Sequence, residues 1–301
     1  MPNDLFVGAY SNTPLLDGTS PKILACVEVA IPLPIPGPFS YLLEENQAAK
    51  AKNGVRVRVP FKNREVSGFL VGFREALPEQ KLKKVIEITD EEPLLTERTL
   101  RLTAWLAEYY FSSWGEAIEA AVPSWVKKGK RWREELPEIA GKPKITAVDV
   151  KLMPEQEKAR RLILQALDEK NPQPILLHGV TGSGKTELYI RAIKDVLGRG
   201  KGAIVLVPEI ALTEQIRRFF LKHFGDELEI LHSKLSNGER FSAWKRIEQG
   251  KKRVLLGPRS ALFAPMPSLG LILLDEEHEG SYKQERSPRY HAREVALWLA
   301  K

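Results

Sequence analysis

Short stretches of alternating apolar and polar residues mark the first part of the chain, between residues 23 and 73. The alternation runs through residues 25–30 and is strict in the pentapeptide Val-Arg-Val-Arg-Val at 55–59. Prolines at positions 32, 34, 36 and 38 interrupt it with turns. Half-buried strands produce a period of two, so these short segments bounded by Pro and Gly favour a small β-barrel or curled sheet.

The second half of the chain alternates apolar runs with amphipathic segments. Strands are predicted at residues 175–178, 203–207, 228–231, 253–256 and 269–274, with helices at 186–197, 211–224 and 238–249. Regular alternation of strand and helix is typical of a parallel sheet covered on both faces. The sequence therefore predicts an α/β fold, a doubly wound parallel sheet preceded by a small, mostly β domain.

The stretches around these two patterns set the expected domain boundaries. Residues 1–22, rich in Pro, Gly, Ser, Asn and Thr, predict a flexible tail. Helices are expected to follow the strands, one of them at residues 96–111, so the first domain spans residues 23–127. The basic stretch 128–150, broken by Pro and Gly, predicts a linker, and residues 151–301 form the second domain.

A glycine-rich stretch follows the first of the apolar runs. Residues 179–186 read Gly-Val-Thr-Gly-Ser-Gly-Lys-Thr, the Walker A form, between a predicted strand and a predicted helix. Such glycines let backbone N–H groups turn inward around phosphate oxygens, and the positive end of the next helix points at the same place. Lys185 can reach the β- and γ-phosphates and the Thr186 hydroxyl can join a Mg²⁺ shell, which predicts a nucleotide site.

An acidic tetrad, Asp275-Glu276-Glu277-His278, ends the last apolar run. Open α/β sheets bind ligands at the carboxyl ends of their strands, so the tetrad is expected beside the phosphate site. Asp275 is suited to hold Mg²⁺, and Glu276 to orient and deprotonate an attacking water. A solvated acidic turn is the alternative. Kinases of metabolites usually lack a second carboxylate before a histidine, so the tetrad favours a helicase-like motor.

Charge and cysteine content narrow the possible partners. Lys and Arg number 46 against 39 Asp and Glu, a net charge of +7, which is compatible with a polyanionic partner. Cys26 is the only cysteine, so no intramolecular disulfide and no cysteine-based zinc site can form within these residues.

The amino terminus lacks the apolar core of a signal peptide and no segment has membrane-spanning length, so a cytoplasmic enzyme is expected.

Eight segments of the chain look like one known family. Those in the second half are residues 179–189, 207–213, 259–265 and 275–284, and those in the first half are residues 29–34, 39–41, 55–61 and 92–93. Together they resemble the primosomal protein N′ family of bacterial replication-restart helicases. The resemblance covers nearly everything from residue 23 to residue 301, and its first half is similar to that family's 3′-DNA-end binding domain.

The resemblance implies an ATP and Mg²⁺ site in a RecA-like lobe. Its nucleotide contacts are expected at Gly179, Gly182, Ser183, Gly184, Lys185 and Thr186, with Gln156 reading the adenine. Lys185, Asp275 and Glu276 are the expected catalytic residues, and Thr186 and Asp275 the expected metal ligands.

The resemblance also implies a pocket for a DNA end in the first domain. Phe39 and Tyr41 are expected to line the pocket for the terminal base, and Lys83 to contact the DNA end. The alternative for an aromatic pair in a small β domain is a place in its core. Ser40 and Lys62 depart from the family, which commonly has Asp and Gly at these positions.

A second DNA contact is implied near the end of the chain. Arg289, Tyr290 and Arg293 belong to a segment similar to the family's aromatic-rich loop, where a Tyr flanked by Arg can stack on a base while the guanidinium groups meet phosphates. The implied partners are DNA forks, 3′ ends and single strands, together with primosome proteins and single-strand-binding proteins.

Two parts of a complete family member have no counterpart in this sequence. The family inserts a winged-helix domain where this chain has residues 128–150. It also continues past a helix at 292–301 with a cysteine-rich zinc module and a second RecA-like lobe that carries an arginine finger. We therefore expect zinc only in that further part, and expect the present residues to be a fragment or a truncated homologue that alone hydrolyses ATP negligibly.

The sequence favours one function and leaves two alternatives. The first is an ATP-dependent 3′-to-5′ DNA helicase of replication restart, represented by its DNA-binding and first motor domains. The second is an adaptor that binds fork DNA and ATP without turnover, and the third is a P-loop phosphotransferase with a small β domain. DNA-stimulated ATPase activity separates the first from the other two, and a phosphorylated small molecule identifies the third.

Overall fold

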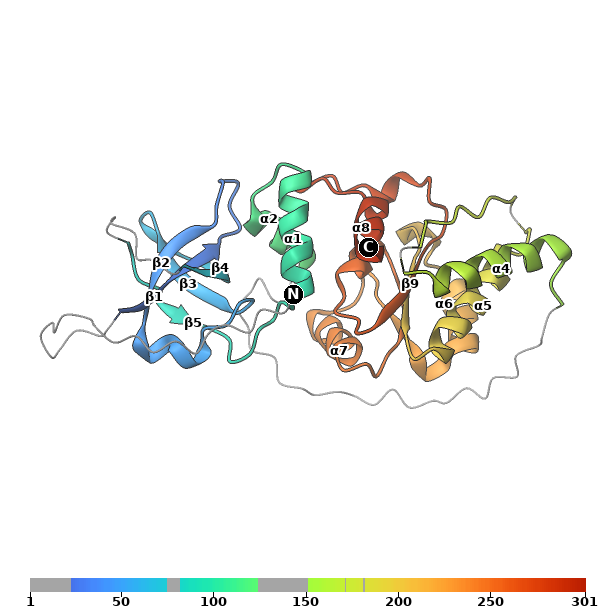
Figure 1. The fold of residues 1–301 in the computed structure, drawn as a ribbon, viewed down its shortest axis with the longest axis horizontal. Coiled ribbons are helices and arrows are strands. Elements are labelled where there is room, and N and C mark those ends of the chain that lie inside the picture. Colours follow the sequence, from blue (N-terminus) through green and yellow to red (C-terminus); the bar gives the residue numbers. More distant parts are fainter. Residues whose placement is uncertain (1–22, 75–81, 124–150, 171, 181) are drawn as a thin grey trace, which may run out of the picture.

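A computed structural model describes residues 23–74, 82–123, 151–170, 172–180 and 182–301. The predicted tail and the predicted linker lie outside these residues. Figure 1 shows a β domain at one end of the molecule, an α/β region at the other, and the helices α1 and α2 between them.

The first domain is a single curled antiparallel sheet, as the alternating pattern predicted. Its strands are β1 (Ile23–Ala30), β2 (Phe39–Glu44), β3 (Arg56–Phe61), β4 (Arg64–Arg74) and β5 (Glu87–Ile88), in the order β2-β1-β4-β3-β5. Val55, Val57 and Val59 are buried on its inner face. Arg56 is also buried, because its guanidinium pairs with Asp90 at 2.5 Å. A buried charge of this kind is stable only when its partner satisfies it.

Two helices follow the sheet. α1 (Glu97–Tyr109) confirms the predicted helix, and its first turn is capped by Thr96, whose hydroxyl accepts from the Thr99 N–H at 3.2 Å. α2 (Trp114–Ala121) was not located from the sequence, which placed a trailing helix only at residues 96–111. It packs against the end of β1 so closely that a Cβ on Gly115 would lie 1.8 Å from a backbone oxygen of Ile31. This position therefore requires glycine.

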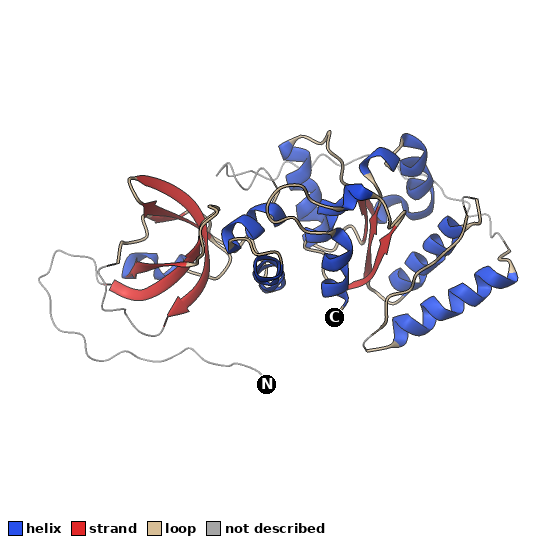
Figure 2. Cartoon of the chain, turned by 90° about the horizontal axis from the view of Figure 1, so that it is seen from above, coloured by secondary structure: helices blue, strands red, loops and turns tan. Residues whose placement is uncertain are grey.

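The second region is an α/β sandwich around a parallel sheet of four described strands. The strands are β6 (Gly202–Leu206), β7 (Leu228–Ile230), β8 (Val254–Gly257) and β9 (Leu269–Leu274), in the order β7-β8-β6-β9. The helices are α4 (Pro154–Asp168), α5 (Lys185–Gly198), α6 (Glu214–Phe224), α7 (Asn237–Glu248) and α8 (Ala292–Ala300). Among the residues that the structure describes, the 3₁₀ turns are η1 (Glu45–Lys50), η2 (Glu209–Ala211), η3 (Gly225–Glu227), η4 (Arg259–Phe263) and η5 (Gly280–Tyr282). Figure 1 shows α5 and α6 on one side of β9 and α7 and α8 on the other, and Figure 2 shows helices on both sides of the strands of this region, which confirms the doubly wound arrangement.

One predicted strand is wrong. Residues 175–178 have no strand conformation, and Leu176 is 80% exposed. β9 is the last strand in the described sheet order, and its six residues are only half-buried. A parallel strand is stabilised by its ladder and by burial on both faces, and the run at 175–178 has neither. Periodicity alone does not decide whether a short apolar run is a strand or another buried segment.

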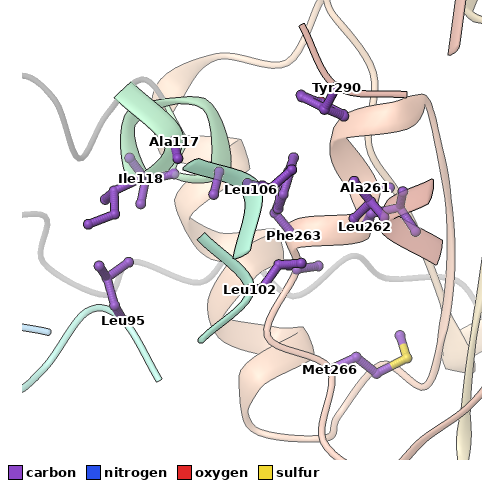
Figure 3. Close-up of a cluster of buried hydrophobic side chains, with 14 of the residues drawn as sticks. Leu95, Leu102, Leu106, Ala117, Ile118, Ala261, Leu262, Phe263, Met266 and Tyr290 are labelled. Carbon is purple, nitrogen blue, oxygen red and sulfur yellow. The ribbon is translucent and has the colours of Figure 1, made fainter. Parts of the chain in front are cut away.

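The two ends of the molecule share one of their hydrophobic clusters. Figure 3 shows Leu102 and Leu106 of α1 facing Leu262 and Phe263 of η4, with all four side chains buried. Trp105 of α1 stacks on Trp298 of α8, with ring centroids 5.9 Å apart. α1 and α2 therefore join the β domain to the α/β region. No helix in the described ranges is both long enough and apolar enough to cross a membrane.

Candidate functional site

The Walker A stretch makes a tight turn into α5. Gly182 and Gly184 have φ values of 81° and 83°, a left-handed conformation that favours glycine. Lys185 is the first residue of α5, and its Nζ donates to the backbone oxygens of Gly179 at 2.5 Å and Val180 at 3.2 Å. The loop thus brings a cation and a helix amino terminus to one place, the arrangement that binds anions.

Gln156, the expected adenine reader, lies against this loop. Its Oε1 accepts from the Met153 N–H at 2.8 Å and closes the first turn of α4, while its Nε2 donates to the Ser183 carbonyl at 2.9 Å. A Cβ on Gly184 would lie 2.3 Å from the same Nε2. The side chain is therefore beside the predicted phosphate site.

Buried hydrogen bonds hold the acidic tetrad at the end of β9. The Asp275 N–H donates to the Leu206 carbonyl at 2.9 Å, which extends the pairing of β9 with β6. The hydroxyl of Tyr282, a residue only 1% exposed, donates to the Asp275 carbonyl at 2.6 Å and lies 3.0 Å from the Leu206 carbonyl. Glu276 is exposed and has a φ of 48°, so the backbone turns sharply after Asp275.

The carboxyl group of Asp275 faces α5. Tyr189, one turn into that helix, donates its hydroxyl to Asp275 Oδ1 at 3.2 Å. Desolvation raises the pKa of Asp275, and the Tyr189 hydrogen bond and the Lys185 charge act against that rise. Desolvation and the nearby Asp275 charge raise the pKa of the Tyr189 phenol, which keeps it a hydrogen-bond donor at neutral pH.

The two expected metal ligands line one cavity of about 240 Å³. Its walls are otherwise mostly apolar and are made by Tyr189, Val205, Val207, Gln215, Ile216, Phe219 and Phe220, beside Thr186 and Asp275. A hydroxyl and a carboxylate are the oxygen ligands that Mg²⁺ takes together with nucleotide phosphates. The residues present therefore fit a Mg²⁺ ion that is shared with a nucleotide. In the described part of the chain, no group of three or more His, Cys, Asp or Glu residues is placed to hold a metal by itself.

The β domain has an open groove beside the expected DNA-end residues. Phe39 packs edge-on against Phe61 with ring centroids 5.1 Å apart, and Lys83 Nζ donates to the Lys62 carbonyl at 3.2 Å. Residues 33–35 and 61–64 line the groove. Lys62 has a φ of 52° in the turn between β3 and β4, a conformation that favours glycine and that fits the family's usual residue. The structure therefore brings Phe39 and Lys83 to one edge of the domain.

Tyr41 does not line that groove, which corrects the sequence expectation. The residue is 4% exposed, belongs to the core of the sheet, and donates its hydroxyl to the Pro60 carbonyl at 3.3 Å. Alternate residues of a strand point to opposite faces, and positions 39 and 41 share the inner face. Tyr41 lies at the centre of that face, where the sheet buries it, while Phe39 starts the strand and stays half-buried.

Tyr290 is a second aromatic residue in the core rather than at the surface. It is 2% exposed, and its ring packs edge-on against Phe263 at 5.3 Å. Burial raises its pKa to about 12. The Gln284 N–H donates to the Tyr290 carbonyl at 2.7 Å, so the segment folds back on itself and turns the ring inward. Its ring is therefore closed to a stacked base, which corrects the expectation for this residue.

The two arginines of that segment remain at the surface. Arg289 is exposed, and Arg293 pairs with Glu277 of the acidic tetrad and with Glu294. Arg293 thus connects the expected DNA loop directly to the expected catalytic edge.

Sequence reasoning missed the two tyrosines that hold Asp275. Tyr189 and Tyr282 both lie in segments that carry the family resemblance, so their presence was a signal without an assigned role. Asp275 is 86 residues from Tyr189, and such a distant contact leaves no periodic pattern in the sequence. Tyr282 is only seven residues from Asp275, but its second contact, with the Leu206 carbonyl, spans 76 residues.

Comparisons with known families match both halves of the chain. Residues 28–123 match the model of the 3′DNA-binding domain (3′BD). Residues 149–298 match the model described as type III restriction enzyme, res subunit.

Several curated relatives carry one name, replication restart protein PriA. The Treponema pallidum protein is 38% identical over 279 residues, which are 90% of this chain and 41% of the relative. The Bacillus subtilis protein is 52% identical over 146 residues, 48% of this chain and 18% of the relative. The Rickettsia felis protein is 34% identical over 264 residues, which are 86% of this chain and 38% of the relative. The chain thus spans about two fifths or less of these relatives, and it belongs to the family of the replication restart protein PriA.

Proposed function

We propose that the chain is the DNA-binding and first motor part of an ATP-dependent 3′-to-5′ DNA helicase of replication restart. One observation carries the proposal. Thr186 of the Walker A stretch and Asp275 of the acidic tetrad, 89 positions apart in the sequence, line the same cavity. This is the pairing that a nucleotide with Mg²⁺ requires. A neighbouring domain that matches a 3′DNA-binding family supports DNA as the partner.

Each residue of the site has a proposed role. Bound ATP would supply the phosphoanhydride bond that is hydrolysed, and bound Mg²⁺ would neutralise charge on the phosphates of ATP. Lys185 holds the β- and γ-phosphates once its ammonium leaves the carbonyl oxygens of the loop. Thr186 and Asp275 hold the metal ion, and Tyr189 fixes the Asp275 carboxyl. Glu276, exposed on the turn after β9, orients water and takes its proton.

The remaining expectations belong to the same proposal. The flanking glycines and Ser183 give backbone contacts to phosphates, and Gln156 reads the adenine from its place beside the loop. We propose DNA forks, 3′ ends and single strands as ligands, and primosome and single-strand-binding proteins as partners, in the cytoplasm. We propose zinc only for the family's cysteine-rich module, which has no counterpart in these residues.

A steady-state ATPase assay tests the motor. We expect negligible hydrolysis by residues 1–301 alone, with or without single-stranded DNA, and DNA-stimulated hydrolysis by a longer form that includes a second lobe. A second lobe supplies an arginine finger, and fingers of this kind contribute roughly 10³–10⁵ in rate in GTPases. A longer form that binds DNA and ATP without turnover would identify the adaptor, and a phosphorylated small molecule would identify a phosphotransferase.

A binding assay with DNA ends tests the β domain. Stacking on an aromatic ring is typically worth about 1–3 kcal/mol per base, so Phe39→Ala is expected to weaken binding to a free 3′ end at least several-fold. Phe73, a half-exposed aromatic on the same sheet, gives the matched control Phe73→Ala. Binding of the unaltered chain that ignores a 3′-phosphate block would remove end recognition from the proposal.

A further inference from the structure

The end of α1 and the turn after it present two aromatic rings that are open to solvent. Phe111 is 97% exposed and has a φ of 52°. This conformation ends α1, because it lets the Ser112 N–H donate to the Ala107 carbonyl at 3.0 Å, but a bulky residue is strained there and its exposed ring adds no burial. Tyr109, two residues before Phe111, is 53% exposed. An exposed ring at a strained position, as in Phe111, points to a function rather than to folding.

The ring of Tyr109 is held in place by its neighbours. It stacks on Trp105 with centroids 5.1 Å apart and planes at 27°, and it meets Tyr110 edge-on at 4.9 Å. Trp105 in turn stacks on Trp298 of α8. One face of Tyr109 therefore rests on a packed aromatic column while half of the residue remains open to solvent. A ring that is fixed before binding loses little entropy when a ligand stacks on it.

A basic segment of the α/β region lies beside this turn. The Tyr110 hydroxyl accepts from the His291 N–H at 3.0 Å, and Lys283 Nζ lies 5.3 Å from the centre of the Tyr110 ring. Figure 1 shows the segment between β9 and α8 reaching the end of α1. Residues 283–291 form this basic segment.

The basic segment carries more positive than negative charge. Lys283, Arg286 and Arg289 are exposed, and Glu285 is the carboxylate among them. Glu108 on α1 and Glu294 on α8 flank the area, and Glu294 pairs with Arg293. The excess of cations beside open aromatic rings complements a strand of bases and phosphates.

We propose that residues 109–111 are a stacking platform for single-stranded DNA, with Lys283, Arg286 and Arg289 contacting its phosphates. The proposal rests on the proposed function for its choice of ligand, and it adds a site between the two domains that is separate from the groove near Phe39. It also gives the basic segment an aromatic partner, since its own Tyr290 is buried. A strand bound here contacts α1 and the segment that pairs with the acidic tetrad through Arg293.

The test uses a substitution that removes the ring without straining the fold. Asn tolerates the left-handed region, so Phe111→Asn leaves the turn intact. We expect Phe111→Asn in residues 1–301 to bind a 3′-phosphorylated single strand at least about fivefold more weakly, because one stacked base is lost. Phe111→Trp keeps a ring and is expected to retain binding. Leu162→Asn, at a half-exposed apolar position on α4, is the matched control and is expected to change nothing.

A second measurement reports stacking directly. A 2-aminopurine base in the strand loses fluorescence when it stacks, so quenching is expected with the unaltered chain and is expected to fall with Phe111→Asn and Tyr109→Ala. Thermal melts of each variant confirm that it is folded.

The outcomes separate the platform from the proposed function. If the unaltered chain binds no single strand at all, both are overturned. If Phe39→Ala loses preference for free 3′ ends while Phe111→Asn and Tyr109→Ala bind blocked strands normally, the platform alone is overturned. Weaker binding by Phe111→Asn with retention by Phe111→Trp and Leu162→Asn supports the platform.

Discussion

The two sides of the candidate nucleotide site are built in different ways. The acidic tetrad ends a strand that is paired with β6, and the buried hydroxyl of Tyr282 holds the Asp275 carbonyl. The Walker A side follows the unpaired run at 175–178, and α4 beside it has no buried residue. A few partly exposed hydrogen bonds from Gln156 and Lys185 hold that side.

This contrast divides the site into a fixed part and an adjustable part. Structure with many buried contacts opens only at a cost near that of global unfolding, whereas structure held by exposed hydrogen bonds opens at little cost. The core therefore sets where the carboxylates lie. The phosphate loop can change its contacts locally, as the Lys185 ammonium must do to reach a phosphate.

The largest expected effect concerns catalysis, where both sides are needed. In a longer form that contains a second lobe, Lys185→Ala and Glu276→Gln are each expected to lower ATP hydrolysis by roughly 10²–10⁴ or more. Nucleotide affinity, measured by titration calorimetry, is expected to fall for Lys185→Ala because a phosphate contact is lost. It is expected to survive Glu276→Gln, which removes the base and leaves the loop unchanged. Equal loss of affinity in both variants would contradict these roles.

The next largest effect compares the shared core with α4. Leu106 is fully buried between α1 and η4, so Leu106→Ala is expected to cost about 2–5 kcal/mol of unfolding free energy. Leu162 on α4 is half-exposed, and Leu162→Ala is expected to stay within about 0.5 kcal/mol. Urea denaturation of the two variants measures both. Similar losses would mean that α4 belongs to the packed core.

A third pair of variants tests the hydrogen bonds on the two sides. Tyr282→Phe leaves the Asp275 carbonyl without its buried donor and is expected to cost about 1–3 kcal/mol in the same denaturation assay. Gln156→Ala removes a partly exposed bond and is expected to cost less than about 1 kcal/mol. The reverse order would make the Walker A side the fixed one.

The smallest effect concerns the pH dependence of stability at Asp275. Its folded pKa is raised, chiefly by desolvation, so the carboxylate form costs stability, and that cost appears as pH rises through the folded pKa. Asp275→Asn is expected to raise the unfolding free energy at pH 7 by less than about 1 kcal/mol, since solvent screens a partly exposed group. The gain is expected to vanish below the unfolded value near about pH 3.9. A gain that grows on acidification would contradict this sign.

The sequence predicted most helices and strands well and contacts between distant segments poorly. β9 was predicted with its observed limits, because six apolar residues lead straight into the acidic tetrad. The run at 175–178 was predicted as a strand although strand formation needs a partner, which local sequence does not supply. α2 was missed because its eight residues are too short for a clear helical period.

The candidate site shows the same division. The Walker A and acidic residues were found because their chemistry depends on local spacing. Tyr41 and Tyr290 were expected to meet DNA, yet both are buried, since a ring that suits stacking on a base also suits a hydrophobic core. Phe111 attracted no notice in the sequence, because its exposure and positive φ are visible only in three dimensions.

The position of β9 at the end of the described sheet bears on how readily the protein associates with other chains. The strand reads Leu-Gly-Leu-Ile-Leu-Leu, without a charge or a proline, and it is the last strand of the described sheet. Natural edge strands usually carry lysines, prolines or bulges that prevent pairing with another chain. An uncharged apolar edge strand is instead a template for intermolecular β-pairing, so we expect the solubility of these 301 residues to depend on how that edge is covered.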